Sequence, residues 1–238
     1  MQTTNDVGSH EQKLSLFHRN LVLSKLDQNS INLLAEETQW NHYSKNSVIW
    51  NNGAEVTWFG LIEKGFVKMV KFNEQGRETT LEIMGPGHTF GCLGTVEGSG
   101  CPLAALAITD LDLLSIPKHE FLTKYEDSMP LQKEMLKVST RRLFAKLSMM
   151  AKLTTGRVDS RIANVLLMLS ESYGVTCKEG IRINIPLTRQ DLSDFTGITL
   201  ESAIRTLSAW QKSGIIQSHS SIVTIVDSAR FAEIAQSS

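Results

Sequence analysis

A short run, Thr199 to Arg205, carries the side chains of this chain that are best suited to contact nucleic-acid bases. A glutamate such as Glu201 can accept a hydrogen bond from the amino group of cytosine, and an arginine such as Arg205 can donate two hydrogen bonds to guanine. The two residues are four positions apart, so on a helix they lie on the same side. The exposed face of that helix would consist of Thr199, Leu200, Glu201, Ser202 and Arg205.

Two short helices separated by a glycine turn would hold these side chains in place. Thr188 is a suitable N-cap for the first helix, and Asp191 completes a capping box with it. Gly197 supplies the left-handed residue that a sharp turn requires, and Thr199 caps the second helix. The apolar residues of the second helix recur at helical spacing, namely Ala203, Ile204, Leu207 and Trp210. This helix would end near Gly214, and the whole pattern is typical of a helix-turn-helix.

Residues on either side of this pattern could contact the DNA backbone. Thr188, Arg189 and Gln190 open the first helix, where hydrogen-bond donors can bind a phosphate. After Gly214, the run IIQSHSSIVTIVD is typical of two short strands, and a hairpin there would form a wing. An ordinary pair of helices in a hydrophobic core would show a similar apolar pattern, so the pattern alone leaves both interpretations open.

The order of the motifs favours the first interpretation. T-R-Q-D-L (188–192) is followed by Gly197, by T-x-E-S-x-x-R (199–205) and by K-S-G-I-I (212–216). This order resembles the C-terminal domain of the Crp/Fnr family of transcription regulators, and the resemblance extends over roughly residues 14–230. It implies a homodimer that binds double-stranded DNA sequence-specifically, controls transcription and has RNA polymerase as a further partner.

The resemblance also suggests which bases are contacted. Glu201 and Arg205 match the Glu and Arg of the family's base-reading helix. Leu200 stands where members that respond to cyclic AMP carry Arg, so this helix looks closer to the Fnr type, whose half-sites are TTGAT-like. Ile204 stands where Fnr-type members carry Ser, which leaves the first bases of the half-site open.

The N-terminal half has a different sequence pattern: short β-rich runs between residues 43 and 117 alternate with glycines. This spacing is typical of a β-sandwich or jelly roll. I-E-K-G-F-V-K (62–68) and G-P-G-H-T-F-G-C-L-G (85–94) resemble the β-roll of cyclic-nucleotide-binding domains, again as in Crp/Fnr proteins. The expected fold class is therefore α+β, with an N-terminal β-roll, a long dimerisation helix and a C-terminal winged helix-turn-helix.

The segments that bind cyclic AMP in relatives have lost their charged residues here. Those relatives carry Glu in a G-E-L motif and an Arg just before a Ser/Thr-Ala pair, whereas this chain has Gly91-Cys92-Leu93 and Pro102-Leu103-Ala104. A buried phosphate without a cation is strongly disfavoured, so we expect no tight binding of cyclic AMP. The effector is an unknown small molecule or redox signal, and its pocket is expected at Phe90, Gly91, Cys92, Leu93, Cys101, Leu103 and Leu147.

Cys92 and Cys101 leave two interpretations open. They could form a thiol pair, or one thiol could act with His88, to sense redox state or a metal. They could equally be two small buried apolar side chains, which is how free cysteines usually behave. Three cysteines are too few for an iron–sulfur cluster held by four thiolates. Neither a metal site nor a certain cofactor is predicted.

A long helix is expected between the two halves, from Leu131 to about Leu153, with two apolar stripes. One stripe contains Leu131, Met135, Val138, Ala145 and Met149. The other contains Leu136, Leu143, Leu147 and Met150. One stripe can pack on the β-roll and the other on a twin helix; a single wide face buried within a monomer is the alternative. The family position of this helix favours the dimer, with the second stripe as its interface.

Composition limits the remaining possibilities. The expected organisation is a mobile tail (1–13), an effector-sensing domain (14–128), a dimerisation helix with a hinge (129–157) and a DNA-binding domain (158–238). No apolar run approaches the roughly 20 residues of a membrane span, so a cytoplasmic protein is expected. The glycines of GPGHTFG miss the spacing of a dinucleotide fingerprint, so an enzyme is not expected. A ligand-binding module acting through protein partners and a DNA binder that has lost its ligand remain as alternatives.

Overall fold

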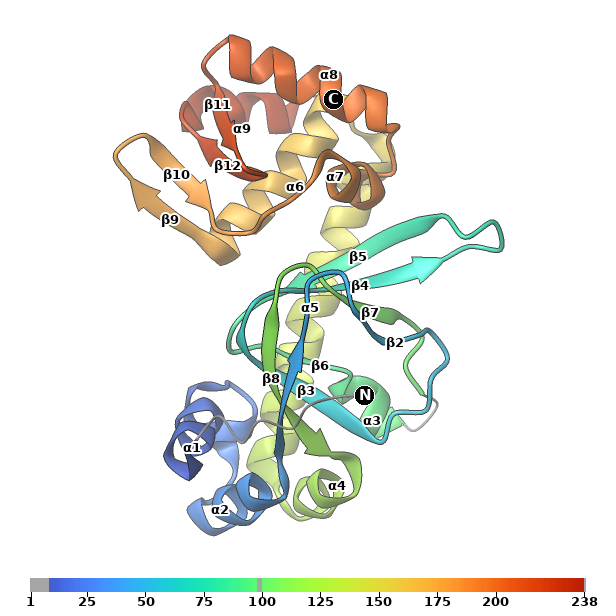
Figure 1. The fold of residues 1–238 in the computed structure, drawn as a ribbon, viewed down its shortest axis with the longest axis vertical. Helices are drawn as coiled ribbons and strands as arrows, with labels where there is room; N and C mark the ends of the chain where they lie inside the picture. Colours follow the sequence, from blue (N-terminus) through green and yellow to red (C-terminus); the bar gives the residue numbers. More distant parts are fainter. Residues whose placement is uncertain (1–8, 98–99, 238) are drawn as a thin grey trace. The chain divides into compact units, whose positions relative to one another are not determined.

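The computed structural model describes residues 9–97 and 100–237, and the chain divides into two compact units, residues 1–142 and 143–238 (Figure 1). The first unit contains two four-stranded antiparallel sheets. One sheet has the order β1-β8-β3-β6, formed by Gln39–Tyr43, Leu111–Pro117, Trp58–Lys64 and Thr89–Phe90. The other has the order β2-β7-β4-β5, formed by Val48–Trp50, Ala104–Ala107, Val67–Phe72 and Glu78–Met84. The expected β-roll is confirmed.

The core of the β-roll lies between the two sheets. It contains Ile62 and Leu113 from the first sheet and Met69 and Ala105 from the second. Leu114, next to Leu113 on β8, belongs to a separate hydrophobic cluster on the opposite face of the first sheet, because successive side chains of a strand point to opposite faces. The first sheet is therefore buried on both sides.

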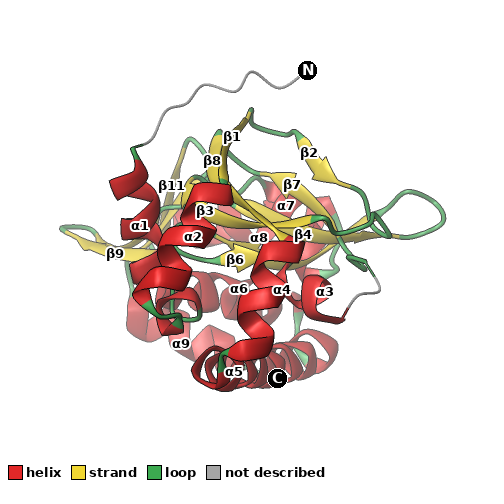
Figure 2. Ribbon diagram, turned by 90° about the horizontal axis from the view of Figure 1, so that it is seen from below, coloured by secondary structure: helices red, strands yellow, loops and turns green. Residues whose placement is uncertain are grey.

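Helices cover the outer face of the first sheet (Figure 2). They are α1 (His10–Arg19), α2 (Gln28–Glu37), α4 (Lys118–Asp127) and the first part of α5 (Met129–Thr155). A short 3-10 turn, η1 (Leu23–Lys25), and the helix α3 (Cys92–Glu97) complete this unit. The expected packing of one α5 stripe is confirmed for its first members, because Leu131, Met135 and Val138 join the cluster beneath the helices.

The expected mobile tail is wrong for residues 10–13, while residues 1–8 lie outside the described part of the chain. Helix α1 begins at His10 because Ser9 and Gln12 form a capping box: the Ser9 hydroxyl accepts from the Gln12 amide, and the Gln12 side chain accepts from the Ser9 amide. Lys13 then donates to the carbonyl of Thr38 at 2.7 Å, which ties the helix to the β-roll unit.

The second unit is built on α6 (Val158–Tyr173), which packs against α7 (Arg189–Thr196), α8 (Leu200–Lys212) and α9 (Ser228–Gln236). Its sheet has the order β11-β12-β10-β9, formed by Ile216–His219, Ile222–Ile225, Gly180–Ile183 and Gly174–Cys177. Strand β10 pairs with β12, so the β9–β10 hairpin extends the sheet formed by β11 and β12. The chain then continues from β10 into α7. The sequence patterns do not indicate β9.

Within residues 9–97 and 100–237, none of the helices combines the length and the apolar character needed to cross a bilayer.

Candidate nucleic-acid interface

Local hydrogen bonds fix the start of α7 and the turn after it. The Thr188 hydroxyl accepts from the Asp191 amide at 3.0 Å, and the Asp191 carboxylate accepts from the Thr188 amide at 2.9 Å, so the expected capping box is confirmed. Gly197 has φ of 67°, the left-handed conformation expected of it. The Ser193 hydroxyl donates to the carbonyl of Ile198 across the turn at 2.8 Å. The turn therefore sets the direction in which α8 leaves.

Helix α8 has one buried face and one exposed face. Ala203, Leu207 and Trp210 are buried, and Trp210 meets Phe231 of α9 edge-on with ring centroids 5.2 Å apart. Ile204, which shares the helical spacing of these apolar residues, is 48% exposed and does not belong to the buried face. It lies about 100° around the helix from Ala203, on the flank between the core side and the side that carries Glu201 and Arg205.

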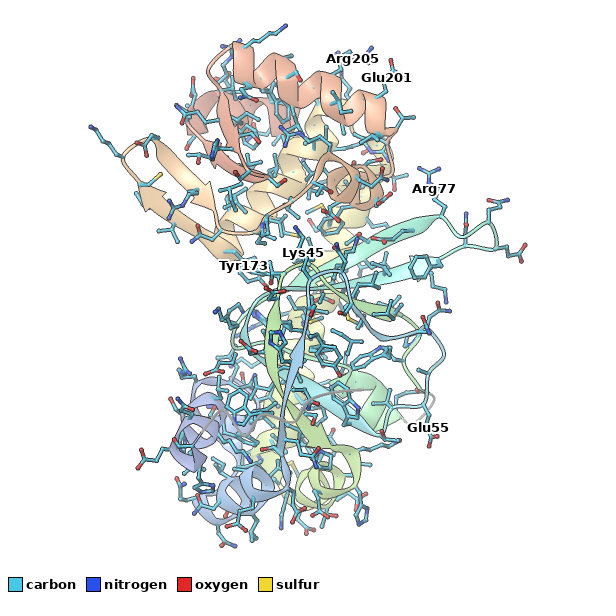
Figure 3. The ribbon with its side chains drawn as sticks, in the orientation of Figure 1. Lys45, Glu55, Arg77, Tyr173, Glu201 and Arg205 are labelled. Atoms are coloured by element: carbon cyan, nitrogen blue, oxygen red, sulfur yellow. The ribbon has the colours of Figure 1, made fainter. Side chains whose placement is uncertain are left out.

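The exposed face presents Glu201 and Arg205 to solvent. Both side chains are exposed and point away from the body of the second unit (Figure 3). Among the described residues neither has a hydrogen-bonding or ion-pair partner through its side chain. The carboxylate and the guanidinium are thus available for an external partner, and their types suit cytosine and guanine.

Two of the expected contact residues also hold the helix together. The Thr199 hydroxyl accepts from the Ser202 amide at 3.2 Å and donates to the Ser202 hydroxyl at 2.9 Å, which confirms Thr199 as the N-cap of α8. Leu200 is 41% exposed and begins the helix. The helix therefore starts at the point where its base-contacting residues are expected.

At the start of α7, Arg189 lies beside the wing. Its Nη1 donates to the Ser218 hydroxyl on β11 at 3.1 Å, and Gln190 donates to Asp194 within α7 at 2.8 Å. The wing itself is the expected hairpin of β11 and β12, turning at Ser220 and Ser221, both with positive φ. Two such residues are the mark of a type I′ turn. The start of α7 and the wing are hence joined by a side-chain hydrogen bond.

In the first unit, the indole of Trp50 lies between the two segments expected to bind an effector. Its Nε1 donates to the carbonyl of Leu103 at 3.2 Å, and a Cβ added at Gly91 would lie 2.9 Å from its Cη2. The indole stacks on Phe90 with ring centroids 5.0 Å apart and meets Trp58 edge-on at 5.3 Å. The chain's own aromatic side chains thus occupy this part of the β-roll.

The other expected pocket residues do not converge on one place. Phe90, Cys101 and Leu103 share the cluster between the sheets, whereas Cys92 belongs to the cluster beneath the helices. Leu93 is exposed. Leu147 belongs to the second unit and is exposed.

The thiols have the character of core residues. Cys92 and Cys101 are free and buried, in different clusters. Burial raises the pKa of the Cys92 thiol to about 12, although Arg142 acts in the opposite direction. Such a thiol stays protonated at neutral pH, and the thiolate is the reactive form. This environment favours small apolar core residues over a redox pair.

His88 is poorly suited to carry a charge. Its Nδ1 lies 3.2 Å from the carbonyl of Gly85, and burial lowers its pKa, with the nearby Arg142 lowering it further. Arg142 itself pairs with Glu82 of β5 at 3.1 Å. Across the part of the chain that the structure describes, no group of three or more His, Cys, Asp or Glu side chains is placed to hold a metal ion.

The stripe expected to form a dimer interface faces solvent along α5. Leu136, Leu143, Leu147 and Met150 are between 50% and 69% exposed, and Phe144 beside them is 66% exposed. Large apolar side chains gathered in this way on one helix mark an interaction surface.

Two family models match the chain. The cyclic nucleotide-binding domain matches residues 40–128, and the Crp-like helix-turn-helix domain matches residues 160–234. These spans cover nearly all of the β-roll and of the α6–α9 region respectively.

Several known proteins are similar to this chain along most of their length. The CRP-like cAMP-activated global transcriptional regulator of Mycobacterium tuberculosis is 25% identical over 215 residues, covering 90% of this chain and 96% of the relative. The global nitrogen regulator of a Nostoc species is 28% identical over 187 residues, covering 77% and 83%. The solved structure of FixK2 from Bradyrhizobium japonicum matches with a TM-score of 0.76 at 21% identity, covering 84% and 98%, and supports the fold. The chain therefore belongs to the CRP/FNR family, and it is a DNA-binding transcriptional regulator rather than an enzyme.

Proposed function

We propose that the protein is a homodimer that binds a palindromic DNA site through the exposed face of α8, with an affinity set by a signal other than a cyclic nucleotide. The observation that carries the DNA part is the face made by Leu200, Glu201 and Arg205. It follows a capped turn and has no partner within the described chain for either charged side chain. Thr199 and Ser202 complete it, and Thr188, Arg189 and Gln190 would bind phosphates.

The exposed apolar stripe on α5 supports the dimer. Leu136, Leu143, Leu147 and Met150 are spaced by seven, four and three residues, which is the spacing of a coiled-coil seam with Thr140 at the missing position. Pairing two such helices would bury all four side chains. To reach both halves of a palindrome, the two recognition helices must then lie about one DNA turn, or about 34 Å, apart. TTGAT-like half-sites are the starting hypothesis for the palindrome.

The signal is proposed to act at the β-roll and at its contact with the long helix. The two segments that bind the cyclic nucleotide in relatives, 91–93 and 102–104, carry no cationic side chain here. The Trp50 indole lies between these segments. A signal can change DNA affinity only by favouring one of two dimer arrangements. We further propose that RNA polymerase is a partner of the protein and that the protein is located in the cytoplasm. The domain limits 14–128, 129–157 and 158–238 are kept as working boundaries.

A second candidate follows from Trp50. Because the indole stacks on Phe90 and bonds to Leu103, the β-roll of this protein could have exchanged ligand binding for internal packing. The protein would then bind DNA constitutively. DNA affinity measured with and without cyclic AMP, oxidant, haem and small carboxylates separates the two functions.

The DNA part is tested by selecting duplexes from a pool of random palindromes with the full chain, then measuring affinity by fluorescence anisotropy. The selected palindrome should bind much more tightly than random DNA of the same length and charge. Inserting roughly five base pairs, half a DNA turn, between the half-sites should abolish that advantage, because two halves of a dimer could no longer face the same side. Unchanged binding after the insertion would contradict a dimer that contacts both half-sites.

A further inference from the structure

The exposed face of α8 carries two aliphatic side chains that do not serve the core. Leu200 is 41% exposed and Ile204 is 48% exposed, whereas the core side of the same helix is made by Ala203, Leu207 and Trp210. A single exposed leucine on a protein surface needs no explanation. Here two large aliphatic residues are four positions apart, and they are therefore neighbours on the helix surface.

Leu200 and Ile204 lie next to the two charged residues that are proposed to contact bases. Glu201 follows Leu200 and Arg205 follows Ile204, so each aliphatic residue is adjacent to one of the two charged residues proposed to contact bases. A helix that enters the major groove with Glu201 and Arg205 pointing to base edges must bring Leu200 and Ile204 to the same groove. Neither aliphatic side chain can donate or accept a hydrogen bond there.

The major groove offers one apolar group, the C5 methyl of thymine. We propose that Leu200 and Ile204 contact thymine methyl groups and so specify thymine at positions beside the base pairs bound by Glu201 and Arg205. This inference rests on the proposed DNA-binding function; it assigns a base preference to Leu200, already part of the proposed face, and adds Ile204 as a specificity-determining residue. An aliphatic side chain placed against the amino group of cytosine would remove water from that donor without replacing the hydrogen bond, which disfavours cytosine.

The test uses the palindrome that the full chain selects from random sequences, at low ionic strength where phosphate contacts favour binding. Each thymine is replaced in turn by deoxyuridine in both half-sites, which removes only the methyl group. Loss of one buried methyl contact should weaken wild-type binding roughly fourfold per half-site at the contacted thymines. The variants Ile204→Ser and Leu200→Ser should each lose this sensitivity at one thymine, and Ile204→Val should retain it.

Leu33→Ser is the matched control, because Leu33 is an exposed aliphatic residue on α2; this variant should behave as the wild type. Circular dichroism checks that the α8 variants fold. Loss of methyl sensitivity in either α8 variant supports the inference. Wild-type protein that binds its palindrome but tolerates every deoxyuridine overturns it, as does sensitivity retained in both variants. Wild-type protein that prefers no palindrome over random DNA overturns the proposed function as well.

Discussion

The α7–α8 region and the centre of the β-roll differ in how their key side chains are positioned. In the first, Thr188, Gly197 and Thr199 act on residues within five positions along the chain, through caps and one left-handed turn. In the second, Trp50 is held by Leu103, 53 residues away, and by the absence of a side chain at Gly91. The surface proposed to contact DNA is thus positioned by local rules, and the proposed signal region by long-range packing.

The largest effect is expected at the α5 stripe, which lies outside both of these regions. Leu147→Glu would place an unpaired carboxylate in the proposed interface, at a cost of several kcal/mol, so the dimer should weaken more than about a hundredfold. Because Leu147 is exposed in the single chain, the protomer should stay folded. Sedimentation equilibrium measures the change.

Val175→Glu on β9 is the control for Leu147→Glu, since it places the same charge at an exposed apolar position outside α5. A Leu147→Glu protein that remains as dimeric as this control would rule out the stripe as the interface.

Trp50→Ala should affect stability rather than DNA contacts. Removing a partly buried indole should lower the free energy of unfolding by roughly 2–4 kcal/mol, while Trp50→Phe should lose less because a ring still meets Phe90. Urea unfolding gives both values. The vacated space is bordered by the rings of Phe90 and Trp58 and by the carbonyl of Leu103, so free indole should raise the stability of Trp50→Ala and leave the wild type unchanged. A variant as stable as the wild type would show that Trp50 does not fill the β-roll.

Arg189→Ala should weaken binding to all DNA sequences alike. A lost phosphate contact removes about one unit per protomer from the slope of log affinity against log salt concentration. Titrations of the selected and the random duplex at several salt concentrations measure it. A loss restricted to the selected duplex would instead assign Arg189 to base contacts.

The smallest effect concerns pH. The pKa of His88 is lowered from its ordinary value of 6.5 by burial and by Arg142. The unfolded chain therefore binds a proton in the window just below pH 6.5 that the folded chain does not, and stability should fall as the pH drops through this window. His88→Gln should flatten that part of the profile, measured by urea unfolding across roughly pH 5 to 7.5. The exposed His119→Gln is the control, and an equal slope in wild type and His88→Gln would contradict the account.

The sequence was sufficient to predict features that depend on neighbours in the chain. The capping box at Thr188, the left-handed Gly197 and the hairpin after Gly214 follow from residue type and spacing. The same rules would also have revealed helix α1, because Ser9 and Gln12 have the spacing of a capping box.

Two positions show where the patterns are insufficient. Apolar spacing groups Ile204 with Ala203, Leu207 and Trp210, although Ile204 lies on the flank of the helix and is 48% exposed. The sequence leaves Cys92 and Cys101 open as a thiol pair or as two buried apolar side chains, and the fold places them in clusters on opposite faces of a sheet. Neither the turn at Gly91 nor the place of the Trp50 indole could be inferred without the sheet register.

The central claim is that α8 contacts bases rather than only the DNA backbone. The most direct test compares wild type and Arg205→Ala on the selected palindrome and on random DNA of the same length, at one salt concentration. The account predicts that Arg205→Ala loses about 1–3 kcal/mol per half-site on the palindrome, little on random DNA, and its discrimination at one guanine. An equal loss on both duplexes would contradict a base-contacting Arg205.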